Sequence, residues 1–99
     1  MINLAVEYLR VNRMALDDFE GQCGELVDEI IHWLGESRVK ILSMRTPDGQ
    51  VLGGRWGYHV APLIDGVVHD AWYPDCVLPP DQYVKRAFPD ENIDLKVFG

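Results

Sequence analysis

Basic residues are scarce in this chain. It contains 9 lysines and arginines against 16 aspartates and glutamates, and its formal net charge at pH 7 is −7. The few basic residues are scattered and form no run. Because phosphate backbones are bound by clustered Lys and Arg, this composition argues against a nucleic-acid partner. An acidic surface instead favours solubility, with some bias toward basic partners.

Long hydrophobic runs and a cysteine framework are also missing. No apolar run approaches the roughly 18 residues of a membrane span, and the opening segment Met1–Glu7 has no basic leader. We therefore expect no membrane partner and no signal peptide. Two cysteines do not make a disulfide framework, so a reducing cytoplasm is the expected compartment. A protein delivered by a dedicated secretion system would show the same features.

What is present is ordinary globular composition. The chain has 99 residues, of which 47% are hydrophobic and 25% charged. This size and composition predict a single domain, residues 1–99, with one core that folds without a metal or a disulfide.

The helical signals differ in strength along the chain. The clearest is an apolar stripe at helical spacing that ends before Gly35 and consists of Cys23, Leu26, Val27, Ile30, Ile31 and Leu34. A looser pattern predicts a helix over residues 3–16, which the polar segment 17–21 interrupts. Pro79-Pro80-Asp81 predicts the start of a short helix that runs to about Ala87.

Strand signals fill the remainder of the chain. The expected strands are Val39–Arg45, Trp56–Ile64, Val67–Trp72 and an edge strand Asn92–Phe98. Pro47–Gly49 predicts a turn, after which Val51-Leu52 is expected to pair back briefly. Asp65-Gly66 is typical of a two-residue hairpin loop. The elements together predict an α+β fold, with helices packed on a small antiparallel sheet.

Three side chains are candidates for chemistry. Cys23 lies in the first turn of the clearest helix, where the positive end of the helix dipole favours thiolate. The same thiol lies on the apolar stripe, and a cysteine there is usually a small core residue. Hairpin register places Ala61 opposite Asp70, so that His59 and Asp70 become diagonal neighbours on one face and His69 falls on the other. Whether Cys23 faces that same side of the sheet stays open.

Together these residue types fit nucleophilic catalysis. A thiol becomes a strong nucleophile when a histidine removes its proton. A carboxylate behind the histidine fixes its tautomer and stabilises the imidazolium. The sequence therefore predicts a catalytic triad of Cys23, His59 and Asp70.

The order and setting of this triad resemble the papain-like and transglutaminase-like cysteine hydrolase superfamily. The segment from Gly21 to Leu26 is similar to its Gly-x-Cys helix opening, and the segment from Trp56 to Asp70 looks like its His-strand, Asp-Gly turn and Asp-strand. The resemblance covers residues 21–75. It implies a minimal version of that fold and an enzyme that cleaves or transfers peptide or glutamine amides through a thioester acyl-enzyme, as peptidases, transglutaminases and bacterial glutamine deamidases do. A bacterial or phage effector would fit this description.

The sequence departs from the superfamily pattern at two positions. No aromatic residue follows Cys23, and Val60 stands where transglutaminases usually place a Trp. These departures leave the substrate class open. They also leave an alternative of another class, a catalytically silent module of the same fold that acts as an inhibitor, immunity or regulatory partner.

The remaining site predictions concern binding. The backbone N–H of Cys23 is a natural oxyanion donor, and Gln22 could add its side-chain amide, although a polar residue before a helix is often only a cap. Trp56 and Trp72 are the tryptophans expected to contact a peptide or protein substrate. No cofactor is implied. Four side chains offer metal ligands but lack the Cys-x-x-Cys or His-x₃-His spacing of a zinc site, so no metal is expected: Cys23, His59, His69 and Cys76.

Overall fold

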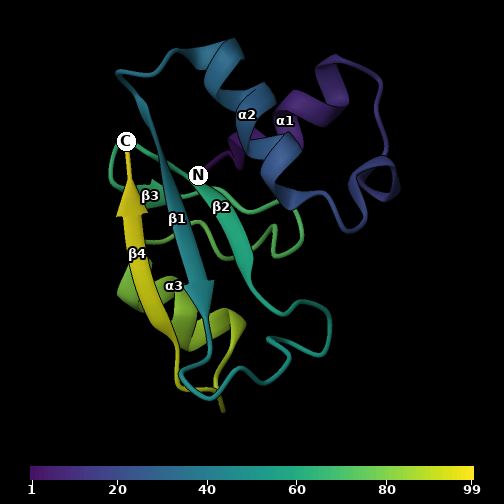
Figure 1. The fold of residues 1–99 in the computed structure, drawn as a ribbon. Coiled ribbons are helices and arrows are strands. Elements are labelled where there is room, and N and C mark those ends of the chain that lie inside the picture. Colours follow the sequence, from purple (N-terminus) through teal and green to yellow (C-terminus); the bar gives the residue numbers. More distant parts are fainter.

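The fold consists of helices packed against a four-stranded antiparallel sheet, and the predicted α+β class is confirmed (Figure 1). The structure is a computed structural model that describes residues 1–99. Its helices are α1 (Leu4–Val11), the 3₁₀ helix η1 (Leu16–Phe19), α2 (Cys23–Leu34) and α3 (Pro80–Ala87). Its strands are β1 (Val39–Arg45), β2 (His59–Ile64), β3 (Val67–Val68) and β4 (Asp94–Phe98), in the sheet order β3-β2-β1-β4.

The sheet buries side chains on both faces, in two separate core clusters. Side chains alternate along a strand, so Leu42 and Ala61 lie on one face while Val39 and Ile64 lie on the other. The first face packs against Tyr83 of α3. The second packs against α1 and α2, whose buried side chains include Leu26 and Ile30. His59 belongs to the α3 side, whereas α2 covers the opposite side.

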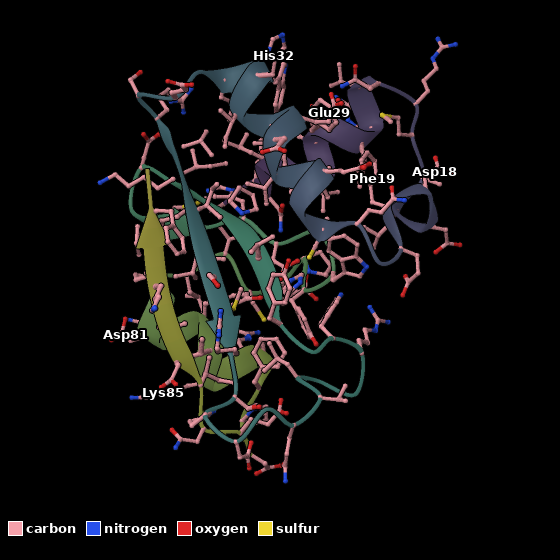
Figure 2. The ribbon with its side chains drawn as sticks, viewed as in Figure 1. Asp18, Phe19, Glu29, His32, Asp81 and Lys85 are labelled. Carbon is pink, nitrogen blue, oxygen red and sulfur yellow. The ribbon has the colours of Figure 1, made fainter.

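Helix α2 has the predicted bounds. Its buried stripe includes Cys23, Leu26, Val27 and Ile30, and Gly35 ends it with a φ of +96°, which a glycine adopts without steric cost. His32 lies on the outer surface of this helix, far along it from Cys23 (Figure 2). The amphipathic pattern therefore places Cys23 in the first buried turn.

The N-terminal helix is shorter than predicted. It ends at Val11, and Arg13 takes a left-handed backbone with a φ of +54°. The chain then forms η1, where Asp18 accepts a hydrogen bond from the Ala15 N–H at 3.0 Å. Figure 2 shows Asp18 and Phe19 in this connection between α1 and α2. Phe19 is buried in the core, so the segment predicted as a polar break contributes to the packing.

The hairpin forms at the predicted turn but pairs over a shorter length. Asp65 and Gly66 both have positive φ values, 52° and 84°, as the tight hairpin turn requires. The predicted strand Trp56–Ile64 begins only at His59. The predicted return strand Val67–Trp72 ends at Val68 because the chain then turns on Asp70, whose carbonyl accepts from the Tyr73 N–H.

The three remaining predicted elements, at Leu52, α3 and β4, follow the predictions in part. Leu52 does not pair back onto β1; it forms an isolated bridge with Trp56. Helix α3 begins at Pro80, one residue after the predicted start. Strand β4 pairs with β1 and forms the exposed edge of the sheet. None of the helices combines the length and apolar character that crossing a membrane requires.

Candidate active site

His59 and Asp70 are joined by a buried hydrogen bond. The Nε2 atom of His59 lies 2.8 Å from Oδ2 of Asp70, and both side chains are almost inaccessible to solvent. The predicted pairing of Asp70 with Ala61 is wrong, since the chain has left the sheet by that point. His69 lies elsewhere, and its Nδ1 accepts a hydrogen bond from the N–H of Leu4 at 2.9 Å.

The carboxylate of Asp70 is fixed by three donors. Besides His59, the hydroxyl of Tyr83 donates to Oδ2, and the backbone N–H of Trp72 donates to Oδ1 at 2.9 Å. The Asn3 side chain also donates to the Asp70 carbonyl at 2.9 Å. Sequence reasoning missed Tyr83, because a tyrosine on the inner side of a short helix reads as ordinary core and nothing in the spacing links it to Asp70.

Cys23 reaches the site around the open edge of β2. The Pro62 carbonyl accepts from the His69 N–H at 3.0 Å, so the backbone groups of the even-numbered β2 residues point toward β3. Because β3 ends at Val68, the Val60 N–H finds no partner there. It points at the Cys23 thiol instead, and this contact helps to lower the thiol pKa. The helix on one face of the sheet thus presents its first residue to a histidine on the other face.

The thiol and the imidazole lie next to each other. With Nε2 on Asp70, the remaining ring nitrogen of His59, Nδ1, is the one that faces Cys23. Nδ1 is buried and makes no hydrogen bond of standard geometry, yet the two groups are close enough for each to shift the pKa of the other. In enzymes without substrate, catalytic hydrogen bonds are often long or poorly aligned, so this geometry is compatible with proton transfer between the two groups.

The electrostatics of the pair favour a thiolate and an imidazolium. Burial acts to raise the Cys23 pKa, but the hydrogen bond and charge of His59 and the N–H groups of Val60 and Gly24 outweigh it, so the net shift is downward. Burial likewise acts to lower the His59 pKa, and the contacts with Asp70 and Cys23 overcome it and raise that pKa to about 9. Around neutral pH, His59 is therefore protonated and the thiol is biased toward its nucleophilic form.

Two tryptophans surround the imidazole. The Trp56 ring stacks on His59 with centroids 3.9 Å apart and an interplanar angle of 21°. The Trp72 ring meets His59 edge-on, at 5.6 Å and 86°. Trp56 is itself buried, so in this form it covers the imidazole and does not line an open cleft. Arg55 lies 5.6 Å from the Trp56 ring on the outside.

The N-terminus of α2 supplies the candidate oxyanion donors. The Cys23 N–H has no backbone acceptor, as is usual for the first residue of a helix. The Gln22 N–H is already used, since it donates to the Phe19 carbonyl at 2.8 Å. The Gln22 side chain is exposed and makes no capping hydrogen bond. Its amide is free to move, and only the Cys23 N–H is held in place beside the sulfur.

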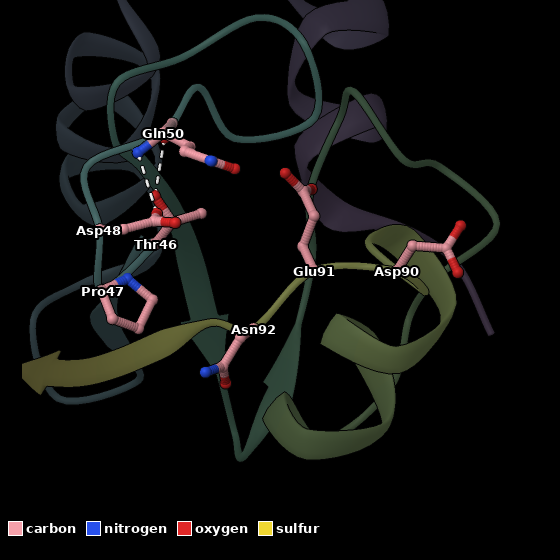
Figure 3. Close-up of a pocket in the computed structure, with 7 residues that line it drawn as sticks. All are labelled: Thr46, Pro47, Asp48, Gln50, Asp90, Glu91 and Asn92. Atoms are coloured by element: carbon pink, nitrogen blue, oxygen red, sulfur yellow. Dashed lines mark hydrogen bonds between the residues drawn. The ribbon is translucent and has the colours of Figure 1, made fainter.

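The other reactive groups and cavities lie apart from this cluster. Cys76 is a buried free thiol, and burial raises its pKa. No group of three or more His, Cys, Asp or Glu residues is arranged to hold a metal ion. The pocket in Figure 3, about 180 Å³, is formed by seven residues that include none of the triad: Thr46, Pro47, Asp48, Gln50, Asp90, Glu91 and Asn92.

Comparisons of this chain with protein-family models, with curated proteins and with solved structures found no match. The resemblance to the papain-like and transglutaminase-like superfamily, which rests on residues 21–26 and 56–70, stays a prediction.

Proposed function

We propose that this protein is a cysteine-nucleophile hydrolase or acyltransferase that acts on peptide or glutamine side-chain amides. The observation that carries the proposal is the continuous buried set of contacts from Cys23 through His59 to Asp70. Each group stands where the chemistry needs it: a thiol with a lowered pKa, a protonated imidazole beside it, and a carboxylate behind the imidazole.

The reaction follows from these positions in two stages. The Cys23 thiolate attacks the amide carbonyl carbon, and the negative charge that develops on oxygen is met by the Cys23 N–H. The tetrahedral species then collapses, its C–N bond breaks, and the leaving amine takes the proton from Nδ1 of His59. A thioester between substrate acyl group and Cys23 remains.

In the second stage His59 acts as a base. It removes a proton from water or from an acceptor amine, which attacks the thioester carbonyl and releases the Cys23 thiolate. Water gives hydrolysis or deamidation, and an amine gives acyl transfer. Asp70 holds the imidazole in one orientation throughout and stabilises its protonated form.

A second candidate function is a binding module that retains the triad without turnover. The observation that favours it is the closure of the site: Cys23 is only 8% exposed, and the Trp56 ring lies over His59. The principal surface cavities are lined by neither Cys23 nor His59. An enzyme of this form must move Trp56 or a neighbouring segment to admit substrate.

Alkylation kinetics test the proposal. The protein is treated with iodoacetamide between pH 5 and 8, and adducts at Cys23 and Cys76 are quantified by mass spectrometry. We expect Cys23 to react at least tenfold faster than Cys76 below pH 7, because its pKa is lowered and that of Cys76 is raised. His59→Ala should abolish the difference, whereas the control His32→Ala, on the outer surface of α2, should leave it intact.

Two results would separate the candidates. Equal and slow labelling of both cysteines in the folded protein would overturn the enzyme proposal. Fast labelling of Cys23, combined with no release of ammonia or amine from glutamine-containing peptides and no acyl-enzyme adduct in the intact mass, would favour the silent module.

A further inference from the structure

Tyr83 is the fully buried group nearest the triad that the reaction scheme does not use. It comes from the middle of α3, its side chain is 0% exposed, and its hydroxyl donates to Oδ2 of Asp70. The Nε2 atom of His59 meets the same oxygen. Tyrosine and histidine therefore share one acceptor atom, while the Trp72 N–H occupies the other oxygen of the carboxylate.

Sharing an acceptor has a direct electrostatic consequence. A hydroxyl that donates to Oδ2 draws negative charge away from the imidazole side of that oxygen. The pull of Asp70 on the His59 proton is weaker than it would be with a single donor. The hydroxyl also fixes the plane of the carboxylate, because Oδ1 and Oδ2 are then held from two different elements.

We propose that Tyr83 is a positioning residue of the triad, and that its hydroxyl sets the acid strength of His59 by sharing Oδ2 of Asp70. The role matters for the proposed function, on which this inference rests, because the imidazolium must give up its proton to the leaving amine. A histidine held too tightly by its carboxylate is a poor general acid. Through Tyr83, helix α3 thus sets the acid strength of His59 from the face of the sheet opposite α2.

The other groups around this pair are few. Asp70 and Cys23 are the charged or titratable neighbours that raise the pKa of His59. Burial raises the pKa of the Tyr83 hydroxyl, and Asp70, Tyr73 and Cys76 raise it further. The Tyr73 ring meets that of Tyr83 edge-on at 6.4 Å, but its hydroxyl makes no hydrogen bond to Asp70. Tyr73 therefore offers a matched control from the same aromatic cluster.

The test compares Tyr83→Phe with Tyr73→Phe. Each change removes one hydroxyl and keeps the ring, and the titration of His59 is followed by NMR of protein labelled with ¹⁵N in its histidine rings. We expect Tyr83→Phe to move the His59 pKa upward by roughly half a unit or more, while Tyr73→Phe leaves it near the wild-type value. The alkaline step in the iodoacetamide profile of Cys23, recorded beyond pH 9 to include the His59 titration, should move in the same direction.

The titration is repeated in a Cys23→Ala background, so that the effect of Tyr83 is measured whether or not Cys23 is a nucleophile. An unchanged or lowered His59 pKa in folded Tyr83→Phe would overturn the inference, as would an equal shift in Tyr73→Phe. Slow alkylation of wild-type Cys23, with the Tyr83→Phe shift present, would instead count against the proposed function alone. If Tyr83→Phe does not fold, the wild-type protein still decides: a downfield hydroxyl proton of Tyr83 close to the His59 ring proton is expected, and its absence would contradict the shared acceptor.

Discussion

At the residue scale, the proposed chemistry depends on one buried carboxylate, that of Asp70. Asp70 receives hydrogen bonds from a histidine, a tyrosine and a backbone amide, and its own carbonyl is held by Asn3. A buried carboxylate is tolerated inside a protein only when donors of this kind satisfy its oxygens.

Replacing Asp70 with Asn tests its importance. The amide keeps the size of the side chain but removes the charge that raises the His59 pKa, so that pKa should fall and the Cys23 thiol should lose its bias toward thiolate. We expect a loss of about 2–4 kcal/mol in the free energy of unfolding and at least tenfold slower alkylation of Cys23 at pH 6. Asp81→Asn, an exposed change in the first turn of α3, is the control. Unchanged alkylation in folded Asp70→Asn would contradict the assignment.

Sequence reasoning could name the triad residues but not their surroundings. Cys23, His59 and Asp70 follow from residue type, chain order and helix position. Tyr83 could not be found this way, because its contact with Asp70 depends on where α3 docks, and docking is set by tertiary packing. The stacking of Trp56 on His59 likewise requires the bridge between Leu52 and Trp56, for which the sequence carries no periodic signal.

At the scale of elements, the loop between β1 and β2 is held in a fixed conformation by a hydrogen bond and a buried side chain. Its Gly53 N–H donates to the Glu91 carboxylate at 3.0 Å, and Leu52 is fully buried. Gly53 has a φ of +58°, and a Cβ there would meet the Tyr73 hydroxyl and the Phe88 ring, each at 2.9 Å. The loop therefore needs a glycine at this position for both conformation and space.

A glycine pair separates these two causes. Gly53→Ala adds a steric clash to left-handed strain, and should cost roughly 3 kcal/mol. Gly54→Ala has a φ of +72° with nothing within 4 Å, so strain alone should cost about 1–2 kcal/mol. Urea unfolding measures both. Equal losses would show that the close approach to Phe88 and Tyr73 does not constrain the loop.

Helix α1 is tied to the site by its N-cap. The Asn3 side-chain oxygen accepts from the N–H groups of Ala5 and Val6, while its nitrogen donates to the Asp70 carbonyl. Asn3→Ser keeps a capping oxygen but cannot reach Asp70, and should cost about 1 kcal/mol. Asn3→Ala loses both functions and should cost about 2 kcal/mol. If thermal or urea unfolding shows the same loss of stability in Asn3→Ser and Asn3→Ala, the capping hydrogen bonds contribute little.

Elements with a clear pattern were the easiest to predict: helix α2 and strand β1 have the predicted bounds, whereas α1 and β3 are shorter than predicted. The bounds of α2 follow from its apolar stripe and Gly35, and the hairpin turn follows from Asp65-Gly66. The length of β3 does not, because Val67–Trp72 has the composition of a strand throughout. The chain leaves the sheet where hydrogen bonds to Asp70 replace the ladder, a competition between local side-chain bonding and strand pairing that composition does not reveal.

At the scale of the whole molecule, the ionised pair governs how stability varies with pH. His59, with a folded pKa of about 9 against 6.5 ordinarily, contributes stability that is present below pH 6.5 and lost as pH rises toward 9. Cys23, with a lowered pKa, contributes in the opposite sense, since its stabilisation grows as pH rises toward its ordinary value of 9.0. The two slopes have opposite signs where they overlap below pH 9.

We therefore expect the free energy of unfolding of the wild-type protein to fall less with rising pH than the His59 shift alone would predict. Cys23→Ala removes the part of the His59 shift that Cys23 causes and leaves the part caused by Asp70 uncompensated. Its stability should therefore fall with rising pH, by less than about 3 kcal/mol. Cys76→Ala should show the same dependence of unfolding free energy on pH as the wild-type protein, because the Cys76 thiol has a raised pKa and no part in the pair. Urea titrations at several pH values measure this. Parallel profiles for Cys23→Ala and wild type would rule out a thiolate–imidazolium pair.

The short length of β3 limits which substitutions in the hairpin are compatible with the proposed function. Extending the ladder by three residues, to Ala71, would give the Val60 N–H a carbonyl partner at the place where it now meets sulfur. Better sheet pairing at this edge would therefore remove one of the contacts that lower the Cys23 pKa. A variant selected purely for thermostability is expected to extend the hairpin and to raise the pKa of Cys23, so stability and the proposed reactivity should trade against each other at residues 69–72.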